Sequence, residues 1–188
     1  VIDGATLVGG RIVCHWLRDV ASALTLHELD GTLVAEPALP GLGSVTMIEG
    51  RTGDRHAHFS FSSFDNPGAV YRLDTRSGDT SVWREPRVDF PFESLAVERE
   101  FYESKDGTRV PIFLVHRKGL PKDGGNPTRL YGYGGFNISM TPAFAASILP
   151  WLELGGLYAV ACLRGGGEYG TEWNEAGKLE RKQNVFDD

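Results

Sequence analysis

The first half of the chain alternates short hydrophobic runs with turn residues and shows no helical period. Seven of these runs have the alternation and the β-branched and aromatic content that are typical of strands, and hairpin turns such as Asp30-Gly31 and Ser77-Gly78 join several of them. They read RIVCHWL, ALTLHEL, TLVAEPAL, SVTMIEG, HAHFSFSSF, GAVYRLD and TSVWRE. This half is therefore predicted to be all-β.

An internal repeat organises these strands. The runs at Arg11 and Ala57 start 46 residues apart, and the Leu-Asp pairs that precede glycine turns at Asp30 and Asp74 lie 44 residues apart. A period of this size, with about four strands per unit, is the signature of β-propeller blades. Because a propeller normally needs at least about four blades, two units indicate an incomplete propeller.

The second half has a different pattern. Residues 86–94, PRVDFPFES, carry two prolines without alternation and are the predicted linker. Strand-like runs then alternate with a run of helical spacing, in the order LAVEREFYES, TRVPIFLVHRKG, TRLYGYGG, TPAFAASILPWLEL (helical) and GGLYAVACL, the last being an apolar strand of the buried parallel type. This order indicates an α/β sheet. We expect two domains, residues 1–87 and 88–188.

Both ends of the sequence predict a longer protein. The chain starts without Met or a charged leader, and in the final QNVFDD, Asp187 or Asp188 has the character of an N-cap for a helix that would follow. Each predicted domain is accordingly expected to be incomplete.

Composition narrows the class of protein. The 188 residues are 41% hydrophobic and 23% charged, which is ordinary for a globular chain, and the net charge of −6 without a Lys/Arg cluster argues against a nucleic-acid partner. No apolar stretch approaches the roughly 20 residues of a membrane helix, so no membrane partner is expected. Cys14 and Cys162 lie in separate apolar runs, which favours two buried free thiols over a disulfide. A cytoplasmic location is expected, and a periplasmic or secreted one is compatible.

The glycine loops and histidines do not fit ligand motifs. Asn137 stands where the dinucleotide fingerprint needs a third glycine, and RGGGEYG lacks the Lys-Ser/Thr of a P-loop. His56 and His58 share a strand face without a third ligand, which favours a polar sheet face over a metal site. His116 has no nucleophile to pair with and is predicted to be a surface residue at a strand end. We expect no metal and no cofactor.

The sequence lacks the Gly-x-Ser-x-Gly motif that carries a hydrolase serine nucleophile. No serine stands in Gly-x-Ser-x-Gly, yet a hairpin, a strand, a glycine loop, a helix and a buried strand follow one another as at the start of an α/β hydrolase. The YGYGG loop by itself is compatible with a tight turn or with a loop built around a bound group. We expect a hydrolase that lacks its catalytic residues here, so that the 188 residues alone are inactive.

Three motifs together carry a resemblance to a known family. YGYGGFNIS, RGGGEYG and KQNVFDD, with SKDGTRVPIFLVHRKG upstream, resemble the prolyl oligopeptidases, serine endopeptidases that cleave short peptides after proline. The resemblance implies that residues 1–87 are the C-terminal blades of a β-propeller. It also implies that residues 88–188 are the N-terminal part of an α/β-hydrolase peptidase domain, before the nucleophile. Short proline-containing peptides would be the substrates, and the full-length enzyme would be monomeric.

The resemblance also implies roles for two residues. Tyr133, the second tyrosine of the motif, would donate its hydroxyl to the oxyanion, and Phe136 would line the proline pocket. Tyr131 receives no comparable role. The Ser, Asp and His of the triad and the tryptophan that stacks on the substrate proline have no counterpart here, so Trp151 and Trp173 are not assigned to it.

The second glycine loop carries two charged residues, Arg164 and Glu168, which the resemblance places near the catalytic face. An ion-paired brace of the loop is favoured for them over substrate contact.

Two alternatives to a proline-specific peptidase stay open. A related oligopeptidase cleaves after basic residues and has similar glycine loops, but the apolar ring of Phe136 suits proline and supplies no charge for Lys or Arg. The segments could also belong to a noncatalytic propeller-containing binding protein. A serine elbow elsewhere in the full gene would distinguish an enzyme from a binding protein.

Overall fold

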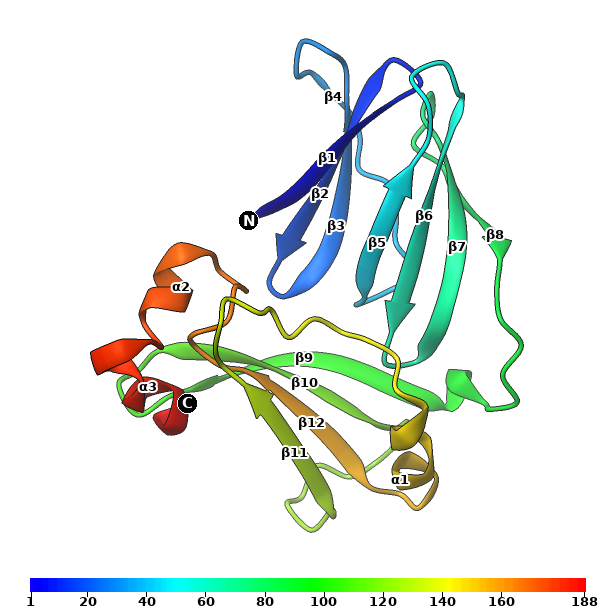
Figure 1. Ribbon diagram of the computed structural model, residues 1–188. Helices are drawn as coiled ribbons and strands as arrows, with labels where there is room; N and C mark the ends of the chain where they lie inside the picture. The colour runs from blue at the N-terminus through cyan, green and yellow to red at the C-terminus, as the bar shows by residue number, and fades with distance from the viewer.

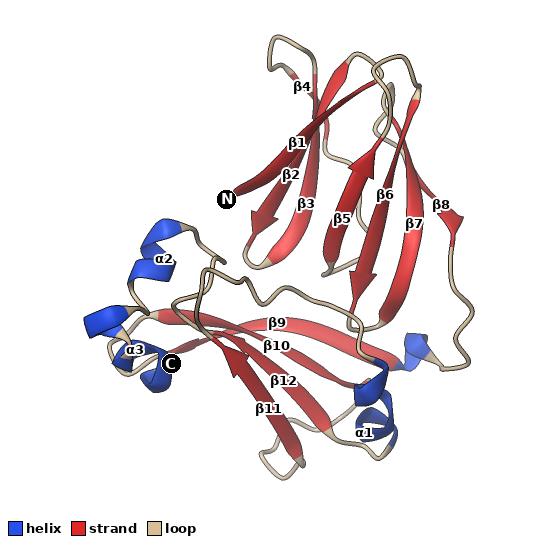
Figure 2. Cartoon of the chain, viewed as in Figure 1, coloured by secondary structure: helices blue, strands red, loops and turns tan.

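The computed structural model describes residues 1–188 and contains three four-stranded sheets (Figure 1; Figure 2). The first two sheets are antiparallel, with their strands paired in chain order. The first contains β1 (Ile2–Val8), β2 (Arg11–Arg18), β3 (Ala21–His27) and β4 (Leu33–Ala35). The second contains β5 (Ser44–Glu49), β6 (His56–Ser63), β7 (Asn66–Asp74) and β8 (Thr80–Arg84). Each of these two sheets therefore has four strands.

The alternating pattern of the strands explains how these two sheets pack. Along β6 every second residue is buried, because side chains of a strand point alternately to its two faces. Phe59 and Phe61 of β6 belong to one core with Leu24 and Leu26 of β3. This shared core holds the two sheets together.

The ends of the first sheet differ from the predicted strands. β1 was not predicted, because IDGATLV has Asp3 and Gly4 near its start and most of its positions are exposed. The run TLVAEPAL forms only the three-residue β4, because Pro37 and Pro40 cannot donate to a ladder.

Cys14 and Cys162 are both free thiols, but only Cys162 is buried, so the prediction that both are buried is wrong for Cys14.

The third sheet is mixed, with the order β11-β12-β10-β9. Its strands are β9 (Leu95–Glu103), β10 (Arg109–Arg117), β11 (Thr128–Tyr133) and β12 (Leu157–Cys162). β9 and β10 form the predicted hairpin, and β12 runs parallel to β11 and antiparallel to β10. The last four residues of β12 are buried, as its continuous apolar sequence predicts.

The helices are short and lie around the third sheet. They are η1 (Phe92–Ser94), η2 (Ala146–Ile148), α1 (Leu149–Glu153), α2 (Thr171–Glu175), η3 (Leu179–Arg181) and α3 (Gln183–Asp187). None of them has the length and apolar character that a membrane crossing requires. Asp187 ends α3, and the Asp188 carboxylate accepts a hydrogen bond from Arg164; the N-cap role of one of these residues stays a prediction.

The helix predicted for TPAFAASILPWLEL is wrong over its first part. Residues 141–145 are not helical and cross between the second and third sheets (Figure 1). The Ser44 hydroxyl donates to the carbonyl oxygen of Pro142 at 2.7 Å, and the backbone N–H of Phe144 donates to the Ser62 hydroxyl at 3.2 Å. The apolar spacing thus comes from packing between sheets, and Pro142 disfavours helix at the residue before it.

The hairpin tip between β2 and β3 joins the first sheet to the third. Asp19 and Val20 have φ angles of 45° and 68°, and Val20 is fully buried against Phe113, Val160 and Cys162. A β-branched residue at positive φ is strained, so burial of this side chain must offset the strain. The tip is a specific contact between the two halves of the molecule.

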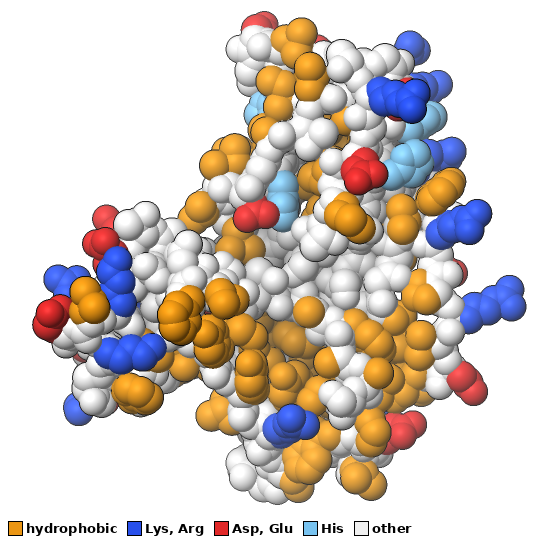
Figure 3. All heavy atoms as spheres, in the orientation of Figure 1, with side chains coloured by type: hydrophobic (Ala, Val, Ile, Leu, Met, Phe, Trp, Pro, Cys, Tyr) orange, Lys and Arg blue, Asp and Glu red, His pale blue; other side chains and the backbone are white.

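Apolar side chains remain exposed on the third sheet. In the space-filling view they gather over the lower part of the molecule, where this sheet lies (Figure 3). Leu130 and Tyr131 of the edge strand β11 are among the exposed large hydrophobic residues. Contiguous apolar surface of this kind is typical of an interface.

Candidate functional site

The carboxyl ends of the parallel strands β11 and β12 lie side by side. Tyr133, the last residue of β11, is in register with Cys162, the last residue of β12. The two glycine loops that follow, residues 134–140 and 163–170, therefore leave the sheet at the same edge. Ligands of α/β sheets bind outside the carboxyl ends of parallel strands, so this edge is the candidate site.

The glycines allow the two loops to touch through their backbones. A Cβ at Gly134 would lie 2.3 Å from the carbonyl oxygen of Arg164, and a Cβ at Gly167 would lie 2.7 Å from that of Asn137. Gly165 has a φ of 92°, which glycine adopts without steric penalty. Its carbonyl oxygen accepts a hydrogen bond from the Asn137 backbone at 3.2 Å.

Phe136 lies within the first glycine loop, three residues after the end of β11. Its side chain is 90% exposed, and both Phe136 and Asn137 have positive φ, at 53° and 58°. Two consecutive non-glycine residues with positive φ are strained, and this backbone conformation persists only when the surroundings hold it. An exposed aromatic ring on a strained loop suggests a ligand contact rather than packing.

Tyr133 lies at the base of the same loop and is partly exposed. Its hydroxyl makes no hydrogen bond with the rest of the chain, although the nearby Lys182 donates to the carbonyl oxygen of Gly134 at 2.6 Å. A Cβ built on Gly135 would lie 3.7 Å from both the Tyr133 hydroxyl oxygen and the Lys182 Nζ, so these two groups approach the same glycine. The structure thus places Tyr133 and Phe136 at one edge of the sheet, the first with an unpartnered phenol hydroxyl and the second with an exposed apolar ring.

Arg164 braces the second glycine loop. The guanidinium is buried and donates to the carboxylate of Asp188 at 2.5 Å and to that of Asp106 at 2.6 Å. The hydrogen bond from Arg164 holds the pKa of Asp106 well below its usual range, and Asp188 raises the pKa of the guanidinium. The predicted brace is present, with Asp106 and Asp188 as its acids.

Glu168 does not take part in that ion pair, so the predicted role is wrong for this residue. Its side chain is 1% exposed, and Oε1 accepts a hydrogen bond of 2.8 Å from the backbone N–H of Met140, while Oε2 has no partner. Burial raises the pKa of this carboxyl. No sequence signal points to the Met140 contact, because it depends on how the two loops meet.

The remaining residues considered in the sequence analysis make contacts within the protein itself. His116 is buried in β10, with Nε2 3.4 Å from Glu98, so its predicted surface position is wrong. The indole N–H groups of Trp151 and Trp173 donate to the backbone carbonyls of Leu157 and Leu163. The structure contains no group of three His, Cys, Asp or Glu side chains in metal-binding arrangement.

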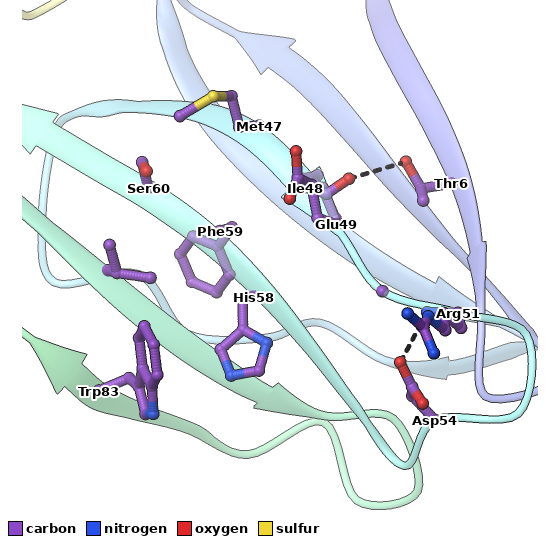
Figure 4. Close-up of a pocket in the computed structure, with 12 residues that line it drawn as sticks. Thr6, Met47, Ile48, Glu49, Arg51, Asp54, His58, Phe59, Ser60 and Trp83 are labelled. Carbon is purple, nitrogen blue, oxygen red and sulfur yellow. Dashed lines mark hydrogen bonds between the residues drawn. The ribbon is translucent and has the colours of Figure 1, made fainter.

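A cavity of about 790 Å³ lies on the second sheet (Figure 4). It is lined by residues of the first two sheets and their turns, including Met47, His58 and Trp83. The ring of His58 stacks edge-on against Trp83 at 5.1 Å between centroids. No residue of the glycine loops lines it, so this cavity is separate from the candidate site.

Comparison with protein families gives two matches. The model described as "Prolyl oligopeptidase, N-terminal beta-propeller domain" matches residues 1–86, and the model "Prolyl oligopeptidase family" matches residues 142–188. The chain belongs to the prolyl oligopeptidase family. The predicted fold class fits these matches in outline, since a propeller domain precedes the start of the hydrolase domain; the domain boundary after residue 87 stays a prediction.

Named relatives of the prolyl oligopeptidase family cover almost the whole chain. Prolyl endopeptidase from Elizabethkingia miricola is 41% identical over 180 residues, which are 96% of this chain and 26% of that protein. The prolyl endopeptidase of Dictyostelium discoideum is 35% identical over 182 residues, or 95% of this chain and 24% of that protein. The chain thus spans about a quarter of the length of these relatives.

Solved structures of the family have the same fold. A structure from a study titled "Structural and Mechanistic Analysis of Two Prolyl Endopeptidases: Role of Inter-Domain Dynamics in Catalysis and Specificity" matches with a TM-score of 0.91 and 46% identity, over 99% of this chain and 28% of that one. Prolyl oligopeptidase B from Galerina marginata, bound to a 25mer macrocyclization substrate, matches with a TM-score of 0.91 and 32% identity, over 99% of this chain and 26% of that one.

Proposed function

We propose that this chain is part of a serine endopeptidase that hydrolyses short peptides on the C-terminal side of proline. The names of the relatives support this reaction, and one observation carries the assignment to this edge of the sheet. The unpartnered Tyr133 hydroxyl stands at the start of the glycine loop that carries the exposed Phe136 ring. One supplies a polar donor and the other an apolar contact, which is what recognition of a peptide carbonyl next to proline requires.

Tyr133 acts on the carbonyl oxygen of the scissile bond. When a serine attacks the carbonyl carbon, negative charge develops on that oxygen, and a donor already in place stabilises the charge without reorganisation. The Tyr133 hydroxyl is available for this because no group in the chain accepts its hydrogen bond. The Lys182 contact with the Gly134 carbonyl fixes the backbone beside it.

Phe136 contacts the prolyl ring of the residue before the scissile bond. Its phenyl ring carries no charge and lies open to solvent, so that covering it with an apolar side chain is favourable. A Lys or Arg side chain would gain no ion pair from it, which favours proline over a basic residue.

The Ser, Asp and His of the triad lie outside these 188 residues in this proposal. The chain contributes the oxyanion donor and part of the pocket, and the propeller and hydrolase segments position them. The substrates are short proline-containing peptides, and the enzyme acts as a monomer.

The test uses the full-length protein and three chromogenic peptides that differ only in having Pro, Ala or Arg before the scissile bond. The expected result is preferred cleavage after Pro, which a serine-reactive phosphonate abolishes. Preferred cleavage after Arg would instead indicate the related oligopeptidase. Peptide binding without cleavage would indicate a binding protein.

A further inference from the structure

We infer that Glu168 is a positioning residue that sets the place of Phe136 through the backbone of Met140. The inference rests on the proposed function, because it concerns how the proline contact is held. Glu168 lies in the second glycine loop and Phe136 in the first, so the contact joins the two loops. The side chain itself is buried and does not reach the surface where a substrate would lie.

The loop that carries Phe136 is anchored at three points. Lys182 binds the carbonyl oxygen of Gly134 at its start, and Gly165 accepts from the backbone N–H of Asn137 near its middle. Glu168 binds the backbone N–H of Met140 at its end, at 2.8 Å. Glu168 is therefore a side-chain anchor on the far side of Phe136.

Both backbone groups of Met140 are held, one by β12 and the other by the loop that follows it. Glu168 accepts from its N–H, and the Cys162 thiol donates to its carbonyl oxygen at 3.3 Å. Burial raises the pKa of the Cys162 thiol, which keeps the thiol protonated as a donor. Cys162 ends β12, so the end of the Phe136 loop is tied directly to the sheet.

Glycine at position 166 leaves room for the Glu168 carboxyl in the second glycine loop. A Cβ on Gly166 would lie 2.1 Å from Oε2 of Glu168, so only glycine leaves the carboxyl in place. Oε2 is buried without a partner, which is unfavourable by itself. The bond from the Met140 N–H to Oε1 is the hydrogen bond that this buried carboxyl makes.

Backbone strain makes the loop depend on this anchor. Phe136 and Asn137 have positive φ, a backbone conformation that costs a non-glycine residue energy and persists only while the surroundings hold it. A relaxed loop would move the phenyl ring away from the prolyl position. The free hydroxyl of Tyr133, which stands on β11 before the loop, would move less.

The test compares variants of the full-length protein on the Pro and Ala peptides. Glu168→Leu removes the acceptor and Gly166→Ala displaces the carboxyl, and each is expected to lower the Pro-to-Ala ratio of kcat/KM about tenfold. Glu168→Gln keeps an oxygen for Met140 and is expected to stay within about threefold of wild type. Glu172→Gln, at an exposed position of α2, and Gly53→Ala, where a Cβ meets nothing within 4 Å, are the matched controls.

A double-mutant cycle separates positioning from a general effect on stability. If Glu168 acts through Phe136, Glu168→Leu changes the Pro-to-Ala ratio much less in a Phe136→Ala background than in wild type. An equal fall in activity on both peptides, with the ratio unchanged, would overturn the inference even if the Tm falls.

Hydrogen exchange gives a readout that does not depend on activity. In Glu168→Leu, or in Gly166→Ala should the first variant not fold, the Met140 amide is expected to exchange at least about tenfold faster than in wild type. Unchanged exchange overturns the inference. Wild-type protein that cleaves no proline peptide refutes the proposed function instead, and the exchange rate then decides separately whether Glu168 holds the loop.

Discussion

The backbone N–H of Asn137 donates a hydrogen bond to the carbonyl oxygen of Gly165, and this bond joins the two glycine loops into one unit. Tyr133 directly precedes the first loop and Phe136 lies within it, whereas the second loop carries Arg164 and Glu168. A substitution in the second loop is therefore expected to change catalysis without touching substrate.

Replacing the oxyanion donor should affect the chemical step. In the full-length enzyme, Tyr133→Phe removes only the hydroxyl and is expected to lower kcat roughly 10²-fold, or about 2.7 kcal/mol, with a smaller change in KM. Steady-state kinetics on a peptide whose chemical step is rate-limiting measures this. Tyr131→Phe is the matched control, since Tyr131 lies two residues earlier on β11 and is expected to leave kcat unchanged. Undiminished kcat in Tyr133→Phe would refute the oxyanion role.

Removing the apolar ring should affect specificity rather than folding. Phe136→Ala is expected to weaken transition-state binding of proline substrates by about 1–3 kcal/mol, because hydrophobic pockets discriminate by amounts of this size. The Tm should change little, since the ring is almost fully exposed in this structure. The ratio of kcat/KM for Pro and Ala peptides provides the measurement. A ratio equal to that of wild type contradicts the pocket assignment.

The buried hairpin tip should stabilise the junction between the sheets. Val20→Ala is expected to lower the free energy of unfolding by about 1–3 kcal/mol, because it removes two buried methyl groups next to Phe113 and Val160. Urea denaturation of the full-length protein measures the change. Leu29→Ala, in the exposed turn after β3, is the control and should stay within about 0.5 kcal/mol of wild type. Equal effects of the two substitutions would mean that Val20 contributes no specific contact.

The buried carboxyl of Glu168 should make stability depend on pH in a defined direction. Its pKa is raised above the ordinary value of 4.5 in the folded state, so the folded protein binds this proton more tightly than the unfolded chain. The contribution of Glu168 to the free energy of unfolding is therefore greatest below pH 4.5 and falls as the pH rises through the folded-state pKa.

Glu168→Gln lacks this titration and provides the comparison. The Tm of wild type minus the Tm of Glu168→Gln is expected to decrease as the pH rises from about 4 to 8. Glu172→Gln, at an exposed position, should show a flat difference over the same range. If the Tm of wild type minus the Tm of Glu168→Gln is constant or rises with pH, Glu168 is not desolvated in the folded protein.

The sequence predicts most strands, because alternation and turn residues act locally. Along β6 the pattern HAHFSFSS places Phe59 and Phe61 on one face, and the structure buries that face. The parallel neighbours β11 and β12 follow in the same way from a strand, a glycine loop and an apolar run. The local pattern fails for residues 141–145, where apolar residues are spaced as in a helix but the backbone is not helical and crosses between two sheets.

Contacts between distant segments account for the other differences. His116 has the sequence context of a strand end, but Glu98 on the neighbouring strand β9 covers it. Glu168 was paired with Arg164 because they are close in sequence, whereas the structure gives Arg164 two other acids and gives Glu168 a backbone amide. The partner of each side chain depends on how distant segments are placed relative to one another. The sequence of one segment does not encode this placement.

The left-handed turn at Val20 has a consequence for the order of folding. The turn is unfavourable until Phe113 and Val160 surround the side chain, and the ribosome synthesises these residues about 90 and 140 positions later. The hairpin of β2 and β3 can pair early, since its contacts are local, but its tip has to wait for the third sheet. The last step in assembling the two halves is then the docking of this tip, so that a nascent chain keeps it mobile until β12 has emerged.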